Sequence, residues 1–247
     1  RVSEMQEHIE HARHLAETYL NLCGLISVKE LTELYLRYYP DGFSASEFDD
    51  FIFFNGLDSF SRFDIWYYGC EPHIVDFRLI DDAPRCEFGE QVVIDGDDMA
   101  VVTDEERFRR YLLSSHRKVA PWEVPSRTAD ELEGYVFYDA VLALPSQVAL
   151  RDFLDANVPD GQDDYFFAEN VIEDLIEIAQ FDFDPSDIID ELRQHGLEFE
   201  SPAKLSRMLT LVMNFTNDVP RWSNNGWSPA ALHERETGRK IFRDENG

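Results

Sequence analysis

The spacing of apolar residues changes once in the first 80 residues, from a helical period to an alternating one, and this order limits the fold. Between residues 4 and 22 the apolar side chains recur three and four positions apart, which predicts an amphipathic helix. Ser27 with Glu30, and Ser44 with Glu47, have the spacing of capping boxes that open helices. The sequence therefore predicts three successive helices.

Two β-rich runs follow these helices. Residues 63–68 and 73–80 are rich in aromatic and β-branched side chains, and residues 69–72 between them contain Gly and Pro, which predicts a β-hairpin. Three helices followed by a hairpin is the order of a winged helix-turn-helix. We therefore expect residues 1–104 to form a winged-helix-like module whose last part is an acidic, β-rich segment. The apolar runs at 92–94 and 99–102 either add strands or belong to a linker.

The position of a DNA-recognition helix is occupied by acidic residues. Glu47, Asp49 and Asp50 lie there without an adjacent Lys or Arg. A helix in the major groove needs donors for base edges and cations for phosphates. The pattern favours a protein-interaction or structural role for this module.

The sequence pattern of residues 105–247 predicts an α-helical domain. Residues 166–179 have apolar side chains on one face and carboxylates on the other. Ser201 and Ser228 each precede a proline, the order of an N-cap followed by the first helical residue. Together the two modules predict a mainly α protein.

The charge is large and uneven. The chain has 22 Lys and Arg against 50 Asp and Glu, a net charge of −28. Residues 41–106 hold 3 basic and 18 acidic groups, and residues 160–200 hold 1 and 14. Such charge disfavours duplex DNA and anionic membranes as partners. It predicts a basic protein partner, unless the acidity only serves solubility in a salt-adapted proteome. The carboxylates expected to contact the partner are Glu47, Asp49, Asp50, Glu169, Glu173, Asp174, Glu177, Asp187, Asp190 and Glu191.

Other composition features point to a reduced, soluble setting. No apolar run approaches the roughly 20 residues of a membrane span. The first residues are polar and do not resemble a signal peptide, so we expect a cytoplasmic protein. Cys23, Cys70 and Cys86 are too widely spaced for a disulfide framework or a zinc clip.

The sequence motifs assign no catalytic residue, cofactor or metal ligand. His8, His11 and His14 drift around their helix, and a solvated face explains them better than a metal site. The run from Asp182 matches part of a calcium loop but has Arg193 where the template needs Glu. Phosphate-binding loops, nucleophile elbows and zinc-protease signatures are missing from the sequence.

One segment of about sixteen residues resembles a known family. Its distinctive residues are Trp222, Asn224, Gly226 and Pro229. The spacing resembles a stretch near the C-terminus of uncharacterised, mostly helical bacterial proteins that often carry a SEC-C metal-binding motif. The resemblance implies a helical architecture and a bacterial cytosol. Since this chain has no cysteine after Cys86, zinc is not carried over. We expect Trp222 to anchor the preceding helix, residues 224–226 to form a turn with positive φ, and Pro229 to open the next helix.

The sequence therefore favours a non-enzymatic protein-interaction module with acidic binding surfaces. A DNA mimic is one alternative, and it requires carboxylates spaced like duplex phosphates along one surface. A metal-dependent enzyme is another, and it requires a concave pocket where histidine and carboxylates converge. The histidines to locate for that test are His8, His73, His116 and His195.

Overall fold

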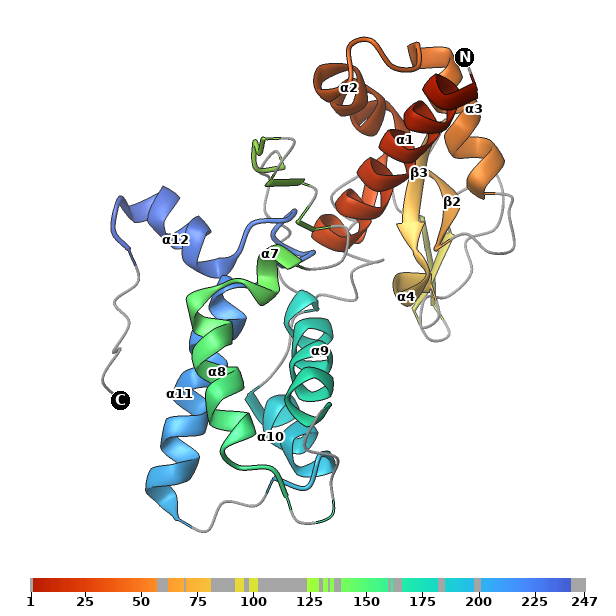
Figure 1. Ribbon diagram of the computed structural model, residues 1–247. Coiled ribbons are helices and arrows are strands. Elements are labelled where there is room, and N and C mark those ends of the chain that lie inside the picture. The colour runs from red at the N-terminus through yellow and green to blue at the C-terminus, as the bar shows by residue number, and fades with distance from the viewer. Residues whose placement is uncertain are drawn as a thin grey trace. The chain divides into compact units, whose positions relative to one another are not determined.

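The computed structural model divides the chain into two compact units, Arg1–Phe137 and Tyr138–Gly247 (Figure 1). We call them the N-terminal and C-terminal units. The structure describes residues 2–56, 62–68, 70–80, 92–95, 98–101, 124–128, 131–132, 134–135, 139–159, 161, 166–181, 185–197 and 201–240. The predicted boundary between residues 104 and 105 lies outside these ranges.

Three helices open the N-terminal unit, as the apolar spacing predicts. They are α1 (Val2–Cys23), α2 (Val28–Tyr38) and α3 (Ala45–Gly56). The capping box at Ser44 is confirmed in both of its bonds, and Ser27 caps α2 through its hydroxyl. The Ser27 hydroxyl accepts from the Glu30 backbone N–H at 3.1 Å, and the Ser44 N–H donates to the Glu47 carboxylate at 2.9 Å.

A three-stranded antiparallel sheet packs with these helices. Its strands are β1 (Leu25–Ser27), β2 (Phe63–Tyr68) and β3 (Glu71–Asp76), in the order β1-β3-β2. Ile74 of β3 lies opposite Ile65 on one side and Ile26 on the other. The mainly helical fold with an N-terminal β-hairpin is therefore confirmed. The strand β1 was not expected, since three residues are too few to show an alternating pattern.

The second predicted strand, residues 73–80, is wrong in its last four residues. Strand β3 ends at Asp76, and a short helix, α4 (Phe77–Ile80), follows. The cause is the buried Asp76 carboxylate, which accepts from the Arg78 backbone N–H at 3.0 Å and from its guanidinium Nε at 2.9 Å. An Asp side chain that bonds the backbone two residues later turns the chain out of a strand.

The core of the N-terminal unit is rich in aromatic rings. Tyr35 and Phe48 are fully buried and stack with ring centroids 4.3 Å apart. Two described residues of a later segment also bond to α1: the Thr18 hydroxyl donates to the Leu132 carbonyl at 3.2 Å, and the Asn21 amide donates to the Tyr135 carbonyl at 2.8 Å. Leu132 and Tyr135 therefore belong to the N-terminal unit.

The acidic segment contains a second hairpin. Strands β4 (Val92–Asp95) and β5 (Asp98–Val101) pair antiparallel, so the two apolar runs add strands. The first part of the predicted helical domain, residues 105–123, lies outside the described residues.

The C-terminal unit is helical in its described residues, as predicted. Its helices are α7 (Asp139–Leu142), α8 (Pro145–Asp155), α9 (Phe167–Gln180), α10 (Pro185–Gln194), α11 (Pro202–Asp218) and α12 (Pro229–Thr237). Ser201 and Ser228 cap α11 and α12 through their side chains. Helices α8 and α11 lie together, and α9 packs with α8 and α10 (Figure 1). No helix of the described residues is long and apolar enough to cross a membrane.

Trp222 is the largest fully buried side chain of the C-terminal unit. Its ring lies 4.7 Å from that of Phe181, and its backbone N–H donates to the Gln180 carbonyl at 3.0 Å. Trp222 therefore packs at the C-terminal end of α9. The following turn has positive φ at Asn225 (54°) and Gly226 (82°), as predicted.

Candidate functional site

Helix α9 separates apolar from acidic residues. Val171 and Leu175 are buried without exposed surface. Glu173 and Glu177 are exposed and form no ion pair with any residue that the structure describes. Glu169 lies 3.5 Å from the Arg151 guanidinium. The helix therefore presents carboxylates to solvent, two of which have no basic partner among the described residues.

Helix α10 has the same division. Ile188 and Leu192 are buried, while Asp187 and Asp190 are exposed. Asp190 forms an exposed ion pair with Arg193 at 3.2 Å. An exposed pair of this kind contributes little to stability, about 0–1 kcal/mol. We call the seven carboxylates of the two helices the α9–α10 acidic surface: Glu169, Glu173, Asp174, Glu177, Asp187, Asp190 and Glu191.

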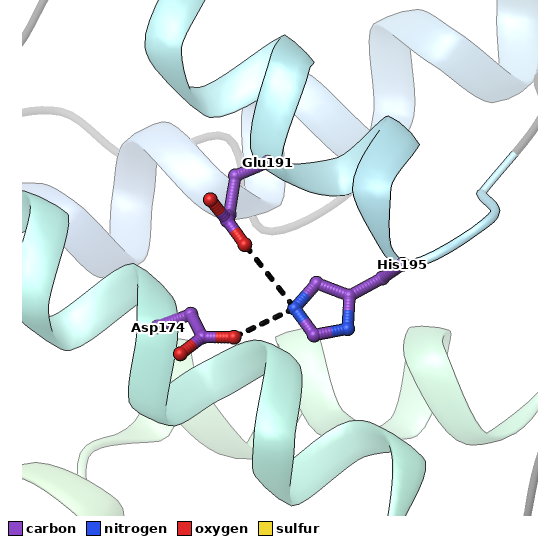
Figure 2. A group of neighbouring side chains, drawn as sticks. All are labelled: Asp174, Glu191 and His195. Carbon is purple, nitrogen blue, oxygen red and sulfur yellow. Dashed lines mark hydrogen bonds and ion pairs between the residues drawn. The ribbon is translucent and has the colours of Figure 1, made fainter.

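The acidic faces of α9 and α10 meet at His195 (Figure 2). The His195 Nε2 atom lies 2.7 Å from Asp174 Oδ2 and 3.3 Å from Glu191 Oε1. Figure 2 shows both carboxylates directed at the same ring nitrogen. The side chains of His195 and Glu191 are 20% and 21% exposed, and that of Asp174 is 46% exposed. The cluster is therefore partly shielded and open to solvent on the Asp174 side.

Local backbone structure fixes the position of His195. The Gly196 N–H donates to the Arg193 carbonyl at 2.9 Å, and the Leu197 N–H donates to the Leu192 carbonyl at 3.0 Å. Gly196 has φ +77°, and these two bonds with a left-handed glycine form a Schellman motif. Leu192 and Leu197 are both buried, which supplies the apolar contact that accompanies the motif. His195 is thus the C-cap of α10 and is held by the bonds around it.

The ring of His195 also contacts α9. Phe167 meets it edge to face, with centroids 6.3 Å apart and planes at 85°. Our sequence reasoning placed Asp174 and Glu191 on acidic faces and named His195 among four histidines to locate for the enzyme alternative, but it did not join the three residues. The signal that would have found it is the spacing of Glu191 and His195, because residues four apart share a helix face.

The acidic residues predicted on α3 have bonds within the N-terminal unit. The Glu47 carboxylate accepts from the Ser44 hydroxyl at 2.6 Å and from its backbone N–H at 2.9 Å. These bonds hold the pKa of Glu47 below its usual value of 4.5. Asp49 accepts from the Thr32 hydroxyl at 2.6 Å. Asp50 is exposed, as is Glu47, whereas Asp49 is half-buried.

Three other histidines named from the sequence have contacts within the N-terminal unit. His8 meets Phe43 edge to face at 5.6 Å, and His11 stacks on Tyr39 at 4.2 Å. These two rings pack on aromatic residues, whereas we expected a fully solvated helix face. His73 is buried, with Nδ1 3.1 Å from the Glu71 carbonyl. His116 lies outside the described residues.

A groove of about 890 Å³ runs between α8 and α11. Its lining residues include Ala149 and Phe153 of α8, and Lys204, Arg207 and Leu211 of α11. The Arg207 guanidinium lies over the Phe153 ring, 5.8 Å from its centroid. None of the groove residues belongs to the His195 cluster. The groove and the histidine–carboxylate cluster are therefore two separate features of the described residues.

The motif that carries the family resemblance is a structural turn. The Trp227 N–H donates to the Asn224 carbonyl at 3.2 Å, and Gly226 has a left-handed backbone. Pro229 begins α12 behind the Ser228 cap, as expected. These residues shape the chain between α11 and α12. Searches against protein-family models, curated proteins and solved structures find no match to this chain.

Proposed function

We propose that this protein is a non-enzymatic protein-interaction module, and that the α9–α10 acidic surface binds a basic segment of a protein partner. The observation that carries the proposal is the contact of Asp174 and Glu191 with His195. Because carboxylates from two helices meet at one side chain, the acidic faces of α9 and α10 adjoin.

The local charge balance supports a basic partner. Residues 160–200 contain one basic residue, Arg193, against 14 acidic ones. Glu173 and Glu177 are four positions apart on α9, and like charges at that spacing repel each other. A Lys or Arg side chain of a partner placed between them relieves the repulsion. Buried apolar residues on the opposite face of α9 hold these carboxylates at the surface.

The same charge favours protein over nucleic acid as the ligand. A net charge of −28 repels phosphate backbones. Complementary charges across a protein interface mainly raise the association rate and set specificity. The partner is therefore expected to bind faster and more tightly at low ionic strength.

The first step of the test is capture of partners by the full chain at low and at moderate salt. A captured protein is then purified, and its affinity is measured directly by calorimetry. The test variant reverses two charges of the acidic surface, Glu173→Lys with Glu177→Lys. The control reverses two exposed carboxylates of α12, Glu234→Lys with Glu236→Lys, so that net charge changes equally.

We expect the α9 variant to bind the partner at least about tenfold more weakly than wild type does, because it loses attraction between complementary charges. A tenfold change in affinity corresponds to about 1.4 kcal/mol of binding free energy. The affinity of the α12 control should stay within about threefold of wild type. Equal losses of affinity in both variants would show that binding depends only on the net charge of the protein, and would contradict a role of the α9–α10 acidic surface. Empty captures at both salt concentrations contradict the proposal.

A further inference from the structure

We propose that Asp174, Glu191 and His195 form a binding site for a divalent cation of the zinc type. Each side chain offers one ligand atom, and within the described residues these atoms lie within 4.8 Å of one another. The three side chains come from α9, from α10 and from the C-cap of α10. This site does not depend on the partner proposed above.

The His195 ring cannot donate to both carboxylates at once. A histidine nitrogen carries at most one proton, yet Nε2 faces Asp174 Oδ2 at 2.7 Å and Glu191 Oε1 at 3.3 Å. One N–H cannot make two good hydrogen bonds, and the two carboxylates that converge on this nitrogen repel each other. A divalent cation removes both problems, because it attracts both carboxylates and binds the lone pair of the deprotonated Nε2.

The donor spacing is close to what a tetrahedral ion requires. Zinc binds imidazole nitrogen and carboxylate oxygen at about 2.0–2.2 Å, so its ligand atoms lie roughly 3.4 Å apart. The separation of Nε2 from Glu191 Oε1 is 3.3 Å and already fits. The contact of Nε2 with Asp174 Oδ2 is 2.7 Å and must lengthen by less than about 1 Å. The Asp174 side chain is 46% exposed and has room to rotate.

The donor types select the class of metal. Imidazole nitrogen suits zinc and the neighbouring transition metals, whereas magnesium and calcium prefer sites made of oxygen alone. A set of one His and two carboxylates therefore favours zinc over magnesium or calcium. Three protein ligands also leave a fourth position for water, or for a donor from another molecule.

The surrounding structure prepares the site for metal. The Schellman motif after α10 fixes the His195 backbone, and the edge of Phe167 restricts its ring. Glu191 is one turn before His195 on the same face of α10. Because two of the three ligands are held before metal binds, little ordering entropy opposes binding.

The experiment is a calorimetric titration of the chelator-treated full chain with ZnCl₂, in about 0.15 M salt to screen diffuse binding to the acidic surface. We expect one tight equivalent of Zn²⁺. The variants Asp174→Asn, Glu191→Gln and His195→Gln each remove one ligand atom, and each should weaken that equivalent at least about tenfold.

The controls remove charge from the same helices without touching the cluster. They are Glu177→Gln and Asp190→Asn, and both should keep the tight equivalent. A second readout is the visible spectrum with CoCl₂, whose intense tetrahedral bands should be present in wild type and lost in His195→Gln. Far-ultraviolet circular dichroism verifies that each variant is folded. A tight equivalent that survives all three ligand variants, or no tight equivalent in wild type, overturns the site.

Discussion

The Thr32 hydroxyl on α2 donates a hydrogen bond to the Asp49 carboxylate on α3, with 2.6 Å between Oγ1 and Oδ1. Thr32 is buried, and its hydroxyl also lies 2.7 Å from the Val28 carbonyl. Asp49 is thus tied to a neighbouring helix inside the N-terminal unit. Its carboxylate contributes to packing of α2 against α3, whatever else it contacts.

We predict that Asp49→Ala destabilises the protein by about 1 kcal/mol, because the Thr32 hydroxyl loses its bond to a charged acceptor and keeps only the neutral Val28 carbonyl. Asp50→Ala removes the same charge from an exposed neighbour and should change stability by less than about 0.5 kcal/mol. Urea denaturation followed by circular dichroism measures both. Equal effects of the two substitutions would contradict a structural role for Asp49.

The Tyr35 hydroxyl occupies the space beside Gly42. A Cβ added at Gly42 would overlap the Tyr35 hydroxyl oxygen, which accepts from the Phe43 N–H at 3.1 Å. Because Tyr35 is fully buried, the ring has little freedom to move. We predict that Gly42→Ala costs about 1–3 kcal/mol of unfolding free energy.

A second substitution tests the cause of this loss. In a Tyr35→Phe background the hydroxyl is gone, so Gly42→Ala should cost less, with a coupling energy above about 0.5 kcal/mol. Denaturation of wild type, both single variants and the double variant gives this value. If the losses of unfolding free energy were strictly additive, the methyl group introduced at position 42 would act through another contact.

Two tryptophans of the C-terminal unit are predicted to differ in their contribution to stability. Trp222 is fully buried against Phe181, so Trp222→Ala should cost about 3–5 kcal/mol. Trp227 is half-buried, and the Arg235 guanidinium lies 4.8 Å from its ring centroid. Trp227→Ala should therefore cost less. Thermal denaturation of the two variants tests the order, and a larger loss from Trp227→Ala would contradict the packing described.

Glu47 should make the stability of α3 depend on pH. Its folded pKa lies below 4.5, chiefly because of the side-chain bond from Ser44 and then the bond from the Ser44 backbone. A depressed folded pKa stabilises the protein above the unfolded value, and this stabilisation is lost as pH falls through the folded pKa. We expect Glu47→Ala to destabilise at pH 7, and this difference from wild type should vanish in acid below the folded pKa. Urea midpoints across that range measure it, and a difference that persists in strong acid would rule out the carboxylate as its source.

The helices and their starts could be predicted because their signals are local. Ser27, Ser44 and Ser228 each cap a helix through a hydrogen bond to the residue three positions later. Both partners of each bond can therefore be recognised from their spacing in the sequence. The end of β3 could not be predicted, because the apolar pattern continues to residue 80 while the Asp76 side chain turns the backbone.

The candidate site could be predicted only in part. The carboxylates of α9 and α10 follow from the helical period, but the meeting of Asp174 with His195 joins residues 21 positions apart. Which residues of two packed helices face each other depends on their tertiary contacts, and the period of one helix contains no information on this. The cluster therefore emerges from the structure.

The distribution of charge within the C-terminal unit also affects how it approaches a partner. Helices α9 and α10 present carboxylates, whereas Lys204 and Arg207 line the groove between α8 and α11. A body with separated charge has an electric dipole moment and turns in the field of a charged molecule before contact. A basic partner would thus meet the acidic side in a preferred orientation, and fewer encounters would be unproductive.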